Sequence, residues 1–396
     1  MEARLALELV SPTDTYLAAL LVVEAQPVAY SLVDGTYFAA SVLQAHFDRY
    51  LNVADRTQTV TGVVCYGEVL LRLTAPQNEV LLQSPTLGLN VGGAEANVAV
   101  SLALLGHRAS VVTVLPENSV GRAALGELRR HGVRTDSIQF RPGRLGLYFL
   151  TVGAGHRPSE VLYDRADSAF ALAPADLIDW GQALGGSSWF HVSGITPAVS
   201  PTAAESALRA VRAARSHGLS VSFDCNYRAK LWERWRGSAR TILRDIMNEA
   251  DLLFAEQRDI ALVLDRNYDT VPHEQRFQVA ASDALAAFPH LQRIVATVRV
   301  QRSVDDHDLS GVLCGRDGLR TTRQYSIGRI IDRIGSGDAF AAGVLHGILT
   351  GANDQGALDF GLAAACLKHS IPGDFNLIGV AEIENLLQDT GFTVRR

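Results

Sequence analysis

The stretch IDRIGSGDAFAAG, Ile331 to Gly343, carries a short Gly-rich turn and one Asp into an apolar helix of small residues. A β-like run, QYSIGRII, leads into it, so the segment predicts a strand, a turn and a closely packed helix in succession. Gly335, Ser336 and Gly337 would expose backbone N–H groups at the helix N-terminus, where the helix dipole favours an anion. The stretch therefore predicts an anion cradle on an α/β scaffold.

Asp338 lies in the first turn of the same helix, directly after the cradle. A carboxylate in this place can take a proton from an attacking hydroxyl, while the neighbouring amides hold the charge of a transferred phosphoryl group. The alternative is an Asp that only stabilises the start of a helix. The motif alone does not separate these two roles.

The chain around this stretch alternates between strand-like and helix-like patterns. From Val63 onward, β-branched runs such as VVCYGEVLLRL and SVVTVL alternate with amphipathic runs such as AEANVAVSLALLGH and GRAALGELRRHG. This alternation predicts the α/β class, with a mainly parallel sheet sandwiched by helices and a ligand crevice at the strand ends. Residues 68–91 and 143–165 instead resemble strand, Gly/Pro turn and strand, so we expect them to form a small β lid.

Residues 1–60 follow neither pattern, and we treat them as an N-terminal extension of unknown role before a main domain at 61–396. Their most apolar run, Tyr16 to Tyr30, is interrupted by Glu24 and Pro27 and lacks the basic flank of a signal peptide. We therefore expect no membrane span and no export signal. The four cysteines are far apart and have no metal-binding spacing, which favours a reduced, cytoplasmic protein.

The composition describes a soluble globular protein with no general attraction for polyanions. The 396 residues are 47% hydrophobic and 20% charged, and the formal net charge is −6. A negative total gives no electrostatic pull toward nucleic acid or an anionic membrane, so neither is an expected partner. An anionic ligand would have to be held by local groups.

A second Gly-rich turn lies in NVGGAEANVAV, about 240 residues before the first. Gly92 and Gly93 would let a ligand approach the backbone, and Asn97 could offer a polyol both a donor and an acceptor. The alternative is a tight turn in which Asn97 is a local cap. The turn lacks a complete GxGxxG, so a dinucleotide site is poorly supported.

A third element, SFDCNYRAKLW, places polar residues at the end of a predicted strand. Asp224, Asn226 and Arg228 alternate, so all three point to one side if the extended backbone continues. The planar guanidinium of Arg228 suits a carboxylate, although a salt bridge at the strand end would explain the same residues. VLYDRADSAF has a similar pattern, in which Tyr163 and Arg165 alternate and are expected to face the same way.

Several common catalytic motifs do not occur in the sequence. GxxxxGK[ST], HExxH and GxSxG are all missing, which argues against a Walker-type phosphate loop, a zinc metalloprotease and a serine hydrolase. Any nucleotide must be held in another way.

Taken together and in this order, VGGAEANVAV, HVSGIT, FDCNYR, DRIGSGDAFAAG and KHSIPGDFN resemble the ribokinase-like (PfkB) family of sugar kinases from about Val63 onward. The likeness is greatest to its branch that acts on 2-keto-3-deoxygluconate. The resemblance implies that Asp338 is the catalytic base and that Gly335, Ser336 and Gly337 form the anion hole for the γ-phosphate. The implied substrate contacts are Gly92, Gly93, Asn97, Tyr148, Tyr163, Arg165 and Arg228. The implied nucleotide contacts are Asn226, Thr297, Arg299, Gly335, Gly337, Gly373 and Asn376.

Three positions depart from the family pattern. Many members have an Asn-x-x-Glu that orders Mg²⁺ through water, whereas this chain has FAEQRD, in which Glu256 is the candidate. Arg299 replaces the Gly of a Thr-x-Gly that often meets the nucleotide, and Ser336 replaces an Ala in the anion-hole turn. The cofactors implied are ATP and Mg²⁺, with a monovalent cation as a further candidate.

The expected activity is ATP-dependent phosphorylation of the C6 hydroxyl of 2-keto-3-deoxygluconate, or of a close sugar acid. The product would be 2-keto-3-deoxy-6-phosphogluconate, an Entner–Doudoroff metabolite. One alternative is a kinase of a neutral sugar such as fructose or ribose, which would not need two arginines in the sugar site. A second is a catalytically silent sugar-acid-binding homologue. The open strand edges of a β lid also favour a homo-oligomer, either a dimer or a larger assembly.

Overall fold

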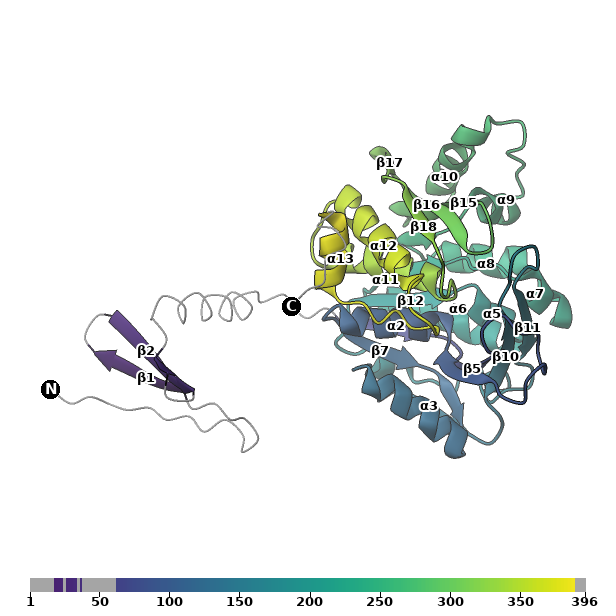
Figure 1. Cartoon of the computed structure of the whole chain (residues 1–396). Coiled ribbons are helices and arrows are strands. Elements are labelled where there is room, and N and C mark those ends of the chain that lie inside the picture. The colour runs from purple at the N-terminus through teal and green to yellow at the C-terminus, as the bar shows by residue number, and fades with distance from the viewer. Residues whose placement is uncertain (1–17, 24–25, 34–35, 38–61, 389–396) are drawn as a thin grey trace. The chain divides into compact units, whose positions relative to one another are not determined.

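The structure is a computed structural model that describes residues 18–23, 26–33, 36–37 and 62–388 (Figure 1). The chain divides into two compact units, Met1–Val60 and Thr61–Arg396. In the first unit, β1 (Ala18–Val23), β2 (Gln26–Val33) and β3 (Thr36–Tyr37) form an antiparallel sheet. The remaining residues of the predicted 1–60 extension lie outside the described part of the chain.

A nine-stranded sheet forms the centre of the second unit, in the order β17-β16-β15-β14-β13-β12-β4-β7, with β18 paired to β16. Six strands are parallel: β4 (Gly62–Tyr66), β7 (Arg108–Val112), β12 (Trp189–Ser193), β13 (Ser220–Asp224), β14 (Leu252–Phe254) and β15 (Arg293–Gln301). The antiparallel strands at one edge are β16 (Asp306–Gly315), β17 (Gly318–Thr321) and β18 (Tyr325–Gly328). The predicted, mainly parallel sheet is confirmed.

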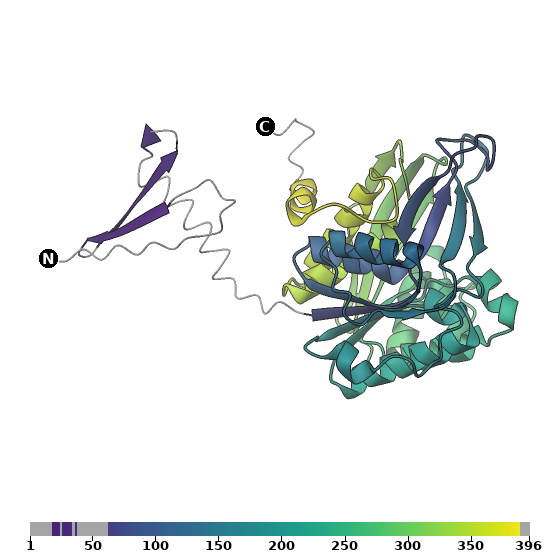
Figure 2. The same ribbon diagram turned by 90° about the horizontal axis from the view of Figure 1, so that it is seen from below.

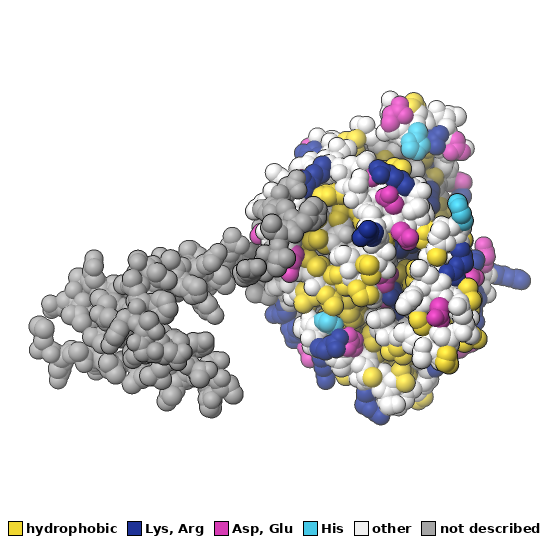
Figure 3. Space-filling view, viewed as in Figure 1, with side chains coloured by type: hydrophobic (Ala, Val, Ile, Leu, Met, Phe, Trp, Pro, Cys, Tyr) yellow, Lys and Arg dark blue, Asp and Glu magenta, His cyan; other side chains and the backbone are white. Residues whose placement is uncertain are grey.

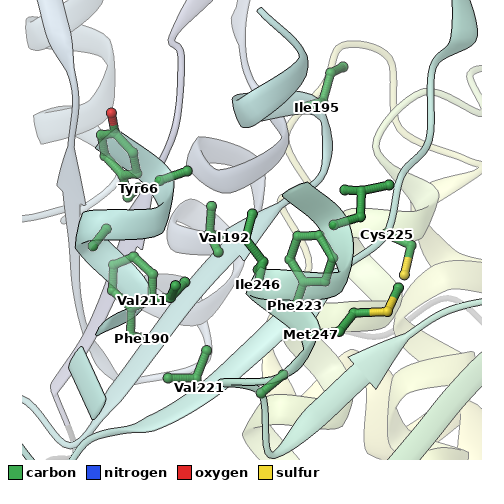
Figure 4. Close-up of a cluster of buried hydrophobic side chains, with 14 of the residues drawn as sticks. Tyr66, Phe190, Val192, Ile195, Val211, Val221, Phe223, Cys225, Ile246 and Met247 are labelled. Carbon is green, nitrogen blue, oxygen red and sulfur yellow. The ribbon is translucent and has the colours of Figure 1, made fainter. Parts of the chain in front are cut away.

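Helices cover both faces of this sheet. One layer contains α2 (Ala94–Leu104), α3 (Ser119–Arg130), α11 (Ser336–Leu349) and α12 (Asp354–Lys368), and its buried residues share a core with Val63 of β4. The other contains α6 (Pro201–Ser216), α8 (Ala239–Met247), α9 (Gln257–Leu264) and α10 (Arg276–Ala287), and shares a core with Val64. Figure 4 shows part of this second core, with Phe190, Phe223 and Ile246 packed together. Successive strand residues point to opposite faces, which explains why β4 is apolar throughout.

The two stretches that interrupt the alternation form a second, four-stranded sheet. It consists of β5 (Leu70–Thr74), β6 (Gly88–Gly92), β10 (Gly146–Thr151) and β11 (Glu160–Asp164), in the order β11-β10-β5-β6. Each stretch is an antiparallel hairpin, and the two hairpins join through a parallel pairing of β5 with β10. Figures 1 and 2 show these strands side by side at the edge of the layered body. We call them the small sheet; its action as a lid stays a prediction.

Short elements complete the unit: β8 (Val114–Pro116) paired with β9 (Gln139–Arg141), α4 (Trp180–Leu184), α5 (Ile195–Ala198), α7 (Ala229–Trp235), the 3₁₀ turn His273–Gln275 and α13 (Val380–Leu387). Within the described ranges, no helix combines the length and apolar character needed to cross a bilayer. All four cysteines are buried and free.

Candidate active site

The Gly-rich turn before α11 forms the predicted cradle. Gly335 is the N-cap of α11 in a left-handed conformation, with φ 80°, and Ser336 begins the helix. A Cβ at Gly335 would lie 2.1 Å from the carbonyl oxygen of Asp374, so both the backbone angle and the space require glycine. The first-turn N–H groups of Gly337 and Asp338 have no carbonyl partner within the helix. They are therefore free to bind an anion.

Gly335→Ala should destabilise the protein because it adds both a clash with a main-chain carbonyl and a strained φ. We expect a loss on the order of 2 kcal/mol in the free energy of unfolding, measured by urea denaturation. The matched control is Gly337→Ala, because a Cβ at Gly337 meets no atom within 4 Å. Equal stability of the Gly335 variant and the wild type would contradict the geometry described for this turn.

Asp338 contacts the second Gly-rich turn rather than its own helix end. Nδ2 of Asn97 donates a hydrogen bond to Oδ2 of Asp338 at 2.6 Å, joining α2 to α11. Neither the cap of α11 nor that of α2 involves a side-chain hydrogen bond, so neither Asp338 nor Asn97 acts as a helix cap. The local-cap role that the sequence left open for Asn97 is thus not seen. Asp338 lies in the first turn of α11, where its charge also suits the helix start.

Burial, and to a smaller extent the carboxylates of Asp224, Glu95 and Asp374, raise the pKa of Asp338 to about 8. The hydrogen bond from Asn97 opposes this shift. Oδ1 of Asn97 is buried and has no hydrogen-bond partner in the described part of the chain. This pair therefore offers a carboxyl group that titrates near neutral pH and an adjacent vacant acceptor, a pairing suited to a hydroxyl ligand.

A cavity of about 330 Å³ opens beside this pair, between the small sheet and the start of α11. Its size lies within the range of small-molecule sites. The predicted residues that line it are Gly93, Asn97, Tyr148, Tyr163, Arg165, Asn226, Arg228, Arg299, Gly335, Ser336, Gly337 and Asp338. Segments far apart in sequence thus meet around one space, which we call the inner cavity.

A second cavity of about 690 Å³, the outer cavity, adjoins the first. Thr297 and Glu256 line it, together with the apolar side chains of Phe254, Leu262 and Phe340. Asp224, Asn226, Arg228, Arg299 and Gly337 line both cavities. Two ligands could therefore meet at the N-terminus of α11.

The FDCNYR segment reaches these cavities by a different path from the one predicted. The extended backbone ends at Asp224, and Asn226 takes a left-handed conformation with φ 33°, so the alternation does not continue. Instead, Oδ1 of Asp224 accepts a hydrogen bond from the Asn226 N–H at 3.1 Å, which turns the chain. Asp224, Asn226 and Arg228 still line the same walls, although the reason is a turn and not a strand.

The two arginines predicted to meet a carboxylate differ in their surroundings. Arg165 is buried, and its Nη2 and Nε each lie 2.6 Å from Oε2 of Glu68. Arg228 is exposed and donates only to the carbonyl oxygen of Tyr227. Among the described acidic side chains, none forms an ion pair with Arg228, so its charge is available to a ligand.

Arg299 and Arg333 add positive charge to the inner cavity. Neither has an acidic ion-pair partner within residues 62–388. Partial desolvation, and then the nearby Arg333 guanidinium, lower the pKa of Arg299. Figure 3 shows basic and acidic side chains interspersed over the face drawn. Arg299 and Arg333 therefore place positive charge at the inner cavity, where a bound anion can meet it.

The carboxylates on the outer cavity do not form a closed metal site. Glu256 lies 3.0 Å from Nε of Arg258, and Asp259 accepts a hydrogen bond from the Glu256 N–H at 2.9 Å. The described residues contain no cluster of three or more metal-ligating His, Cys, Asp or Glu side chains. This fits Mg²⁺ bound mainly by phosphate oxygens and water, with one carboxylate nearby, as is usual for this ion.

Three predicted residues do not line either cavity. Gly92 ends β6, where a Cβ would lie 2.3 Å from Oδ1 of Asp374. Gly373 donates its N–H to Oδ2 of Asp332 at 3.0 Å. Asn376 is buried, with Oδ1 lacking a hydrogen-bond partner among the described residues. Gly92 and Gly373 therefore pack against acidic residues next to the anion-hole turn, and Asn376 is part of the buried interior.

Among the charged side chains that line the inner cavity, sequence reasoning noted Asp224 without giving it a ligand contact and missed Arg333 and Asp374. Each lies inside a stretch singled out above, namely FDCNYR, DRIGSGD and KHSIPGDFN. These motifs could therefore have indicated the region. Which side chain of each motif faces a ligand depends on backbone turns that the sequence pattern does not specify.

Comparison with known proteins agrees with this geometry. The family described as pfkB family carbohydrate kinase matches residues 60–376. The chain is 32% identical to the 2-dehydro-3-deoxygalactonokinase of Haloferax volcanii, over 82% of this chain and 96% of that protein.

Solved structures give the same picture. The crystal structure of 2-dehydro-3-deoxygluconokinase from Thermotoga maritima is 38% identical, with a TM-score of 0.78, covering 83% of this chain and 99% of that one. A structure from Escherichia coli, provisionally assigned as a ribokinase II, has a TM-score of 0.69 at 18% identity, covering 83% and 99% of the two chains. That last likeness shows the fold alone, and the ribokinase-like fold is confirmed.

Proposed function

The chain belongs to the pfkB family of carbohydrate kinases, and we propose that it phosphorylates the C6 hydroxyl of 2-keto-3-deoxygluconate or of its galacto epimer, using ATP. The predicted family and the predicted sugar kinase activity are confirmed, and a kinase of this type implies ATP as phosphoryl donor. The choice of a sugar acid rests on the names of the relatives, in which 2-dehydro is a synonym of 2-keto, and on one observation. That observation is Arg228, which lines the inner cavity with Asp338 and forms no ion pair with any described acidic side chain.

We propose that Asp338 acts as general base on the sugar. The C6 hydroxyl would give its proton to Oδ1 or Oδ2 of Asp338 as its oxygen bonds to the γ-phosphorus. The bond from that phosphorus to the β–γ bridging oxygen would break, and ADP would leave. Asn97 already donates a hydrogen bond to Asp338 at 2.6 Å and would fix the orientation of that carboxylate. Its unpaired Oδ1 would accept a hydrogen bond from a sugar hydroxyl. Such a base contributes roughly 10²- to 10⁴-fold to the rate.

The remaining acceleration would come from positioning and charge stabilisation at the start of α11. The N–H groups of Gly337 and Asp338, together with Arg299 and Arg333 on the same cavity, would hold the transferring phosphoryl group. ATP would occupy the outer cavity, with Asn226, Thr297 and Arg299 along it. Mg²⁺, when bound, would neutralise phosphate charge, and Glu256 is the residue we expect to order its water.

The substrate carboxylate would bind Arg228, whose planar guanidinium can donate two parallel hydrogen bonds. Tyr148, Tyr163 and Arg165 also line the inner cavity, on or next to strands of the small sheet. Arg165 would support this wall through Glu68 rather than act as a second free cation. The small sheet, in its predicted role as a lid, would exclude water that could otherwise hydrolyse ATP.

A kinase of a neutral sugar would use the same base and anion hole, but would have no need of an unpaired Arg228. A silent homologue is disfavoured because Asp338, Asn97 and the Gly-rich turn are all assembled. We also retain cytoplasmic location and self-association through the small sheet as proposals. The exposed Leu89 and Leu162 on its strands are the observation that favours self-association.

An ADP-release assay with the purified chain would test this proposal against both alternatives. The panel would contain 2-keto-3-deoxygluconate, its galacto epimer, fructose and ribose at equal concentration. We expect rapid ADP release with one or both acids and little with the neutral sugars. Faster turnover of fructose or ribose would point to a neutral-sugar kinase, and tight binding of the acid without turnover would point to a silent homologue.

A further inference from the structure

Asp374 lies at the point where the two Gly-rich turns meet. It follows α12 in the chain, and only 3% of its surface is exposed. Its carbonyl oxygen fills the space where Gly335 would carry a Cβ, and its carboxylate fills that space at Gly92. One buried residue therefore packs against both the anion hole and the turn that precedes Asn97.

The Asp374 carboxylate also binds two neighbouring strands of the small sheet. The Tyr148 hydroxyl of β10 donates to Oδ1 at 2.6 Å, and Nη1 of Arg72, on β5, lies 3.2 Å from Oδ2. Tyr148 and Arg72 are direct partners in the parallel register of the two strands. The Asp374 carboxylate thus joins two strands of the small sheet to the residue that packs against Gly335.

Arg72 extends the network to the other side of the anion hole. Its Nη2 donates to Oδ2 of Asp332 at 2.5 Å. Asp332 in turn accepts hydrogen bonds from the N–H of Ile334 at 2.9 Å and of Gly373 at 3.0 Å. The Arg72 guanidinium therefore bridges Asp332, which precedes Gly335 in the chain, and Asp374, which packs against Gly335.

The charges of this network are buried and balanced. The side chains of Arg72 and Asp332 are 4% and 9% exposed. A second buried cation, Lys368, donates from Nζ to the carbonyl oxygen of Ile371 at 2.9 Å. Lys368 interacts electrostatically with both Asp332 and Asp374. Two acidic and two basic side chains therefore share a largely buried region, where removing one of them leaves the others uncompensated.

We propose that Arg72 and Asp332 are positioning residues that couple the small sheet to the anion-hole turn. Neither lines the inner or the outer cavity, so neither is expected to touch a ligand. Their effect would be exerted through Asp374, which fixes Gly335 and Tyr148, and through Ile334, next to Gly335. This inference rests on the proposed kinase function and adds to it the groups that hold its amides in place.

Arg72→Met and Asp332→Asn test this coupling. Because small misplacements of reacting groups can cost about a hundredfold in rate, we expect kcat to fall roughly tenfold to a hundredfold in each variant. KM for ATP should change by less than about threefold, and ATP hydrolysis per sugar phosphorylated should rise, because the displaced sheet admits water. The double variant should lose little more than the worse single one, because the two residues share one contact.

The matched control is Arg144→Met, which removes another arginine next to the same sheet. Arg144 pairs with Asp164 at 2.9 Å, the two side chains are 39% and 53% exposed, and neither residue lines the inner or the outer cavity. This variant should keep wild-type kcat and the wild-type hydrolysis ratio.

A purely structural role for Arg72 and Asp332 would lower the melting temperature while leaving kcat and the hydrolysis ratio of the folded variants unchanged, and that result would overturn the inference. If Arg72→Met does not fold, Asp332→Asn decides alone, since it preserves shape and removes one charge. A wild-type chain that fails to phosphorylate the acid would instead reject the proposed function.

Discussion

Asp338→Asn lowers kcat by roughly a hundredfold to ten-thousandfold, because the amide cannot take the proton of the attacking hydroxyl. The side chain keeps its shape and can still meet Asn97, so the dissociation constant of the sugar acid should change by only a few-fold. Single-turnover kinetics measure the chemical step, and calorimetry measures sugar binding. Near-normal turnover in this variant would remove Asp338 from the role of base.

The matched control for this variant is Asp354→Asn. Asp354 also lies in the first turn of a helix, α12, but it pairs with Arg293 at 2.7 Å and lines neither the inner nor the outer cavity. We expect wild-type kcat in this variant. A comparable loss of activity in both variants would indicate a general effect of acidic helix starts on the fold.

The pH dependence of the wild-type enzyme should follow the ionisation of Asp338. Only the deprotonated carboxylate can accept a proton, and burial raises its pKa to about 8. The value of kcat/KM should therefore rise with pH through this pKa and level off above it. A profile that is flat from pH 6 to about 9 would argue against a base with this environment.

Arg228→Ala lowers kcat/KM for 2-keto-3-deoxygluconate by about tenfold to a hundredfold, since a hydrogen bond to a charged group contributes about 1.5 to 3 kcal/mol. Activity toward a neutral sugar should stay unchanged or improve. The measurement is the ratio of kcat/KM for the acid to that for fructose. Arg228 forms no ion pair with a described acidic side chain, but its charge opposes the burial-raised pKa of the nearby Asp224 and Asp259. The ratio cancels any effect of its removal that is common to both sugars.

Lys230→Ala is the control for Arg228→Ala. Lys230 is an exposed cation two residues further along, on α7, and it lines neither cavity. Lys230→Ala removes one positive charge from the same region but leaves the proposed contact between Arg228 and the substrate carboxylate intact. If kcat/KM for the acid falls to the same extent in both variants, the effect is general electrostatic attraction and Arg228 has no specific role.

The elements that could be predicted from the sequence are those with local signals. The alternation of VVCYGEVLLRL with AEANVAVSLALLGH specified β4 and α2, and IGSGD specified the turn before α11. The two hairpins followed from their Gly and Pro turns. In each case, neighbouring residues in the chain determine the backbone, so the pattern is sufficient.

The contacts that could not be predicted join residues far apart in sequence. Arg165 meets Glu68 across 97 positions, and Arg72 meets Asp332 across 260. Neither pair leaves a periodic trace, so the sequence could not show that Arg165 already has a partner. The left-handed Asn226 is local, but its turn depends on a hydrogen bond to Asp224 that competes with an extended strand.

The most direct test of the central claim is the identity of the product formed from ATP and 2-keto-3-deoxygluconate by the wild-type chain. Phosphorus-31 NMR should show one new phosphate monoester whose signal is split by the two protons at C6, formed in equal amount with ADP. A phosphate on another hydroxyl, or ADP release without any sugar phosphate, would contradict the account.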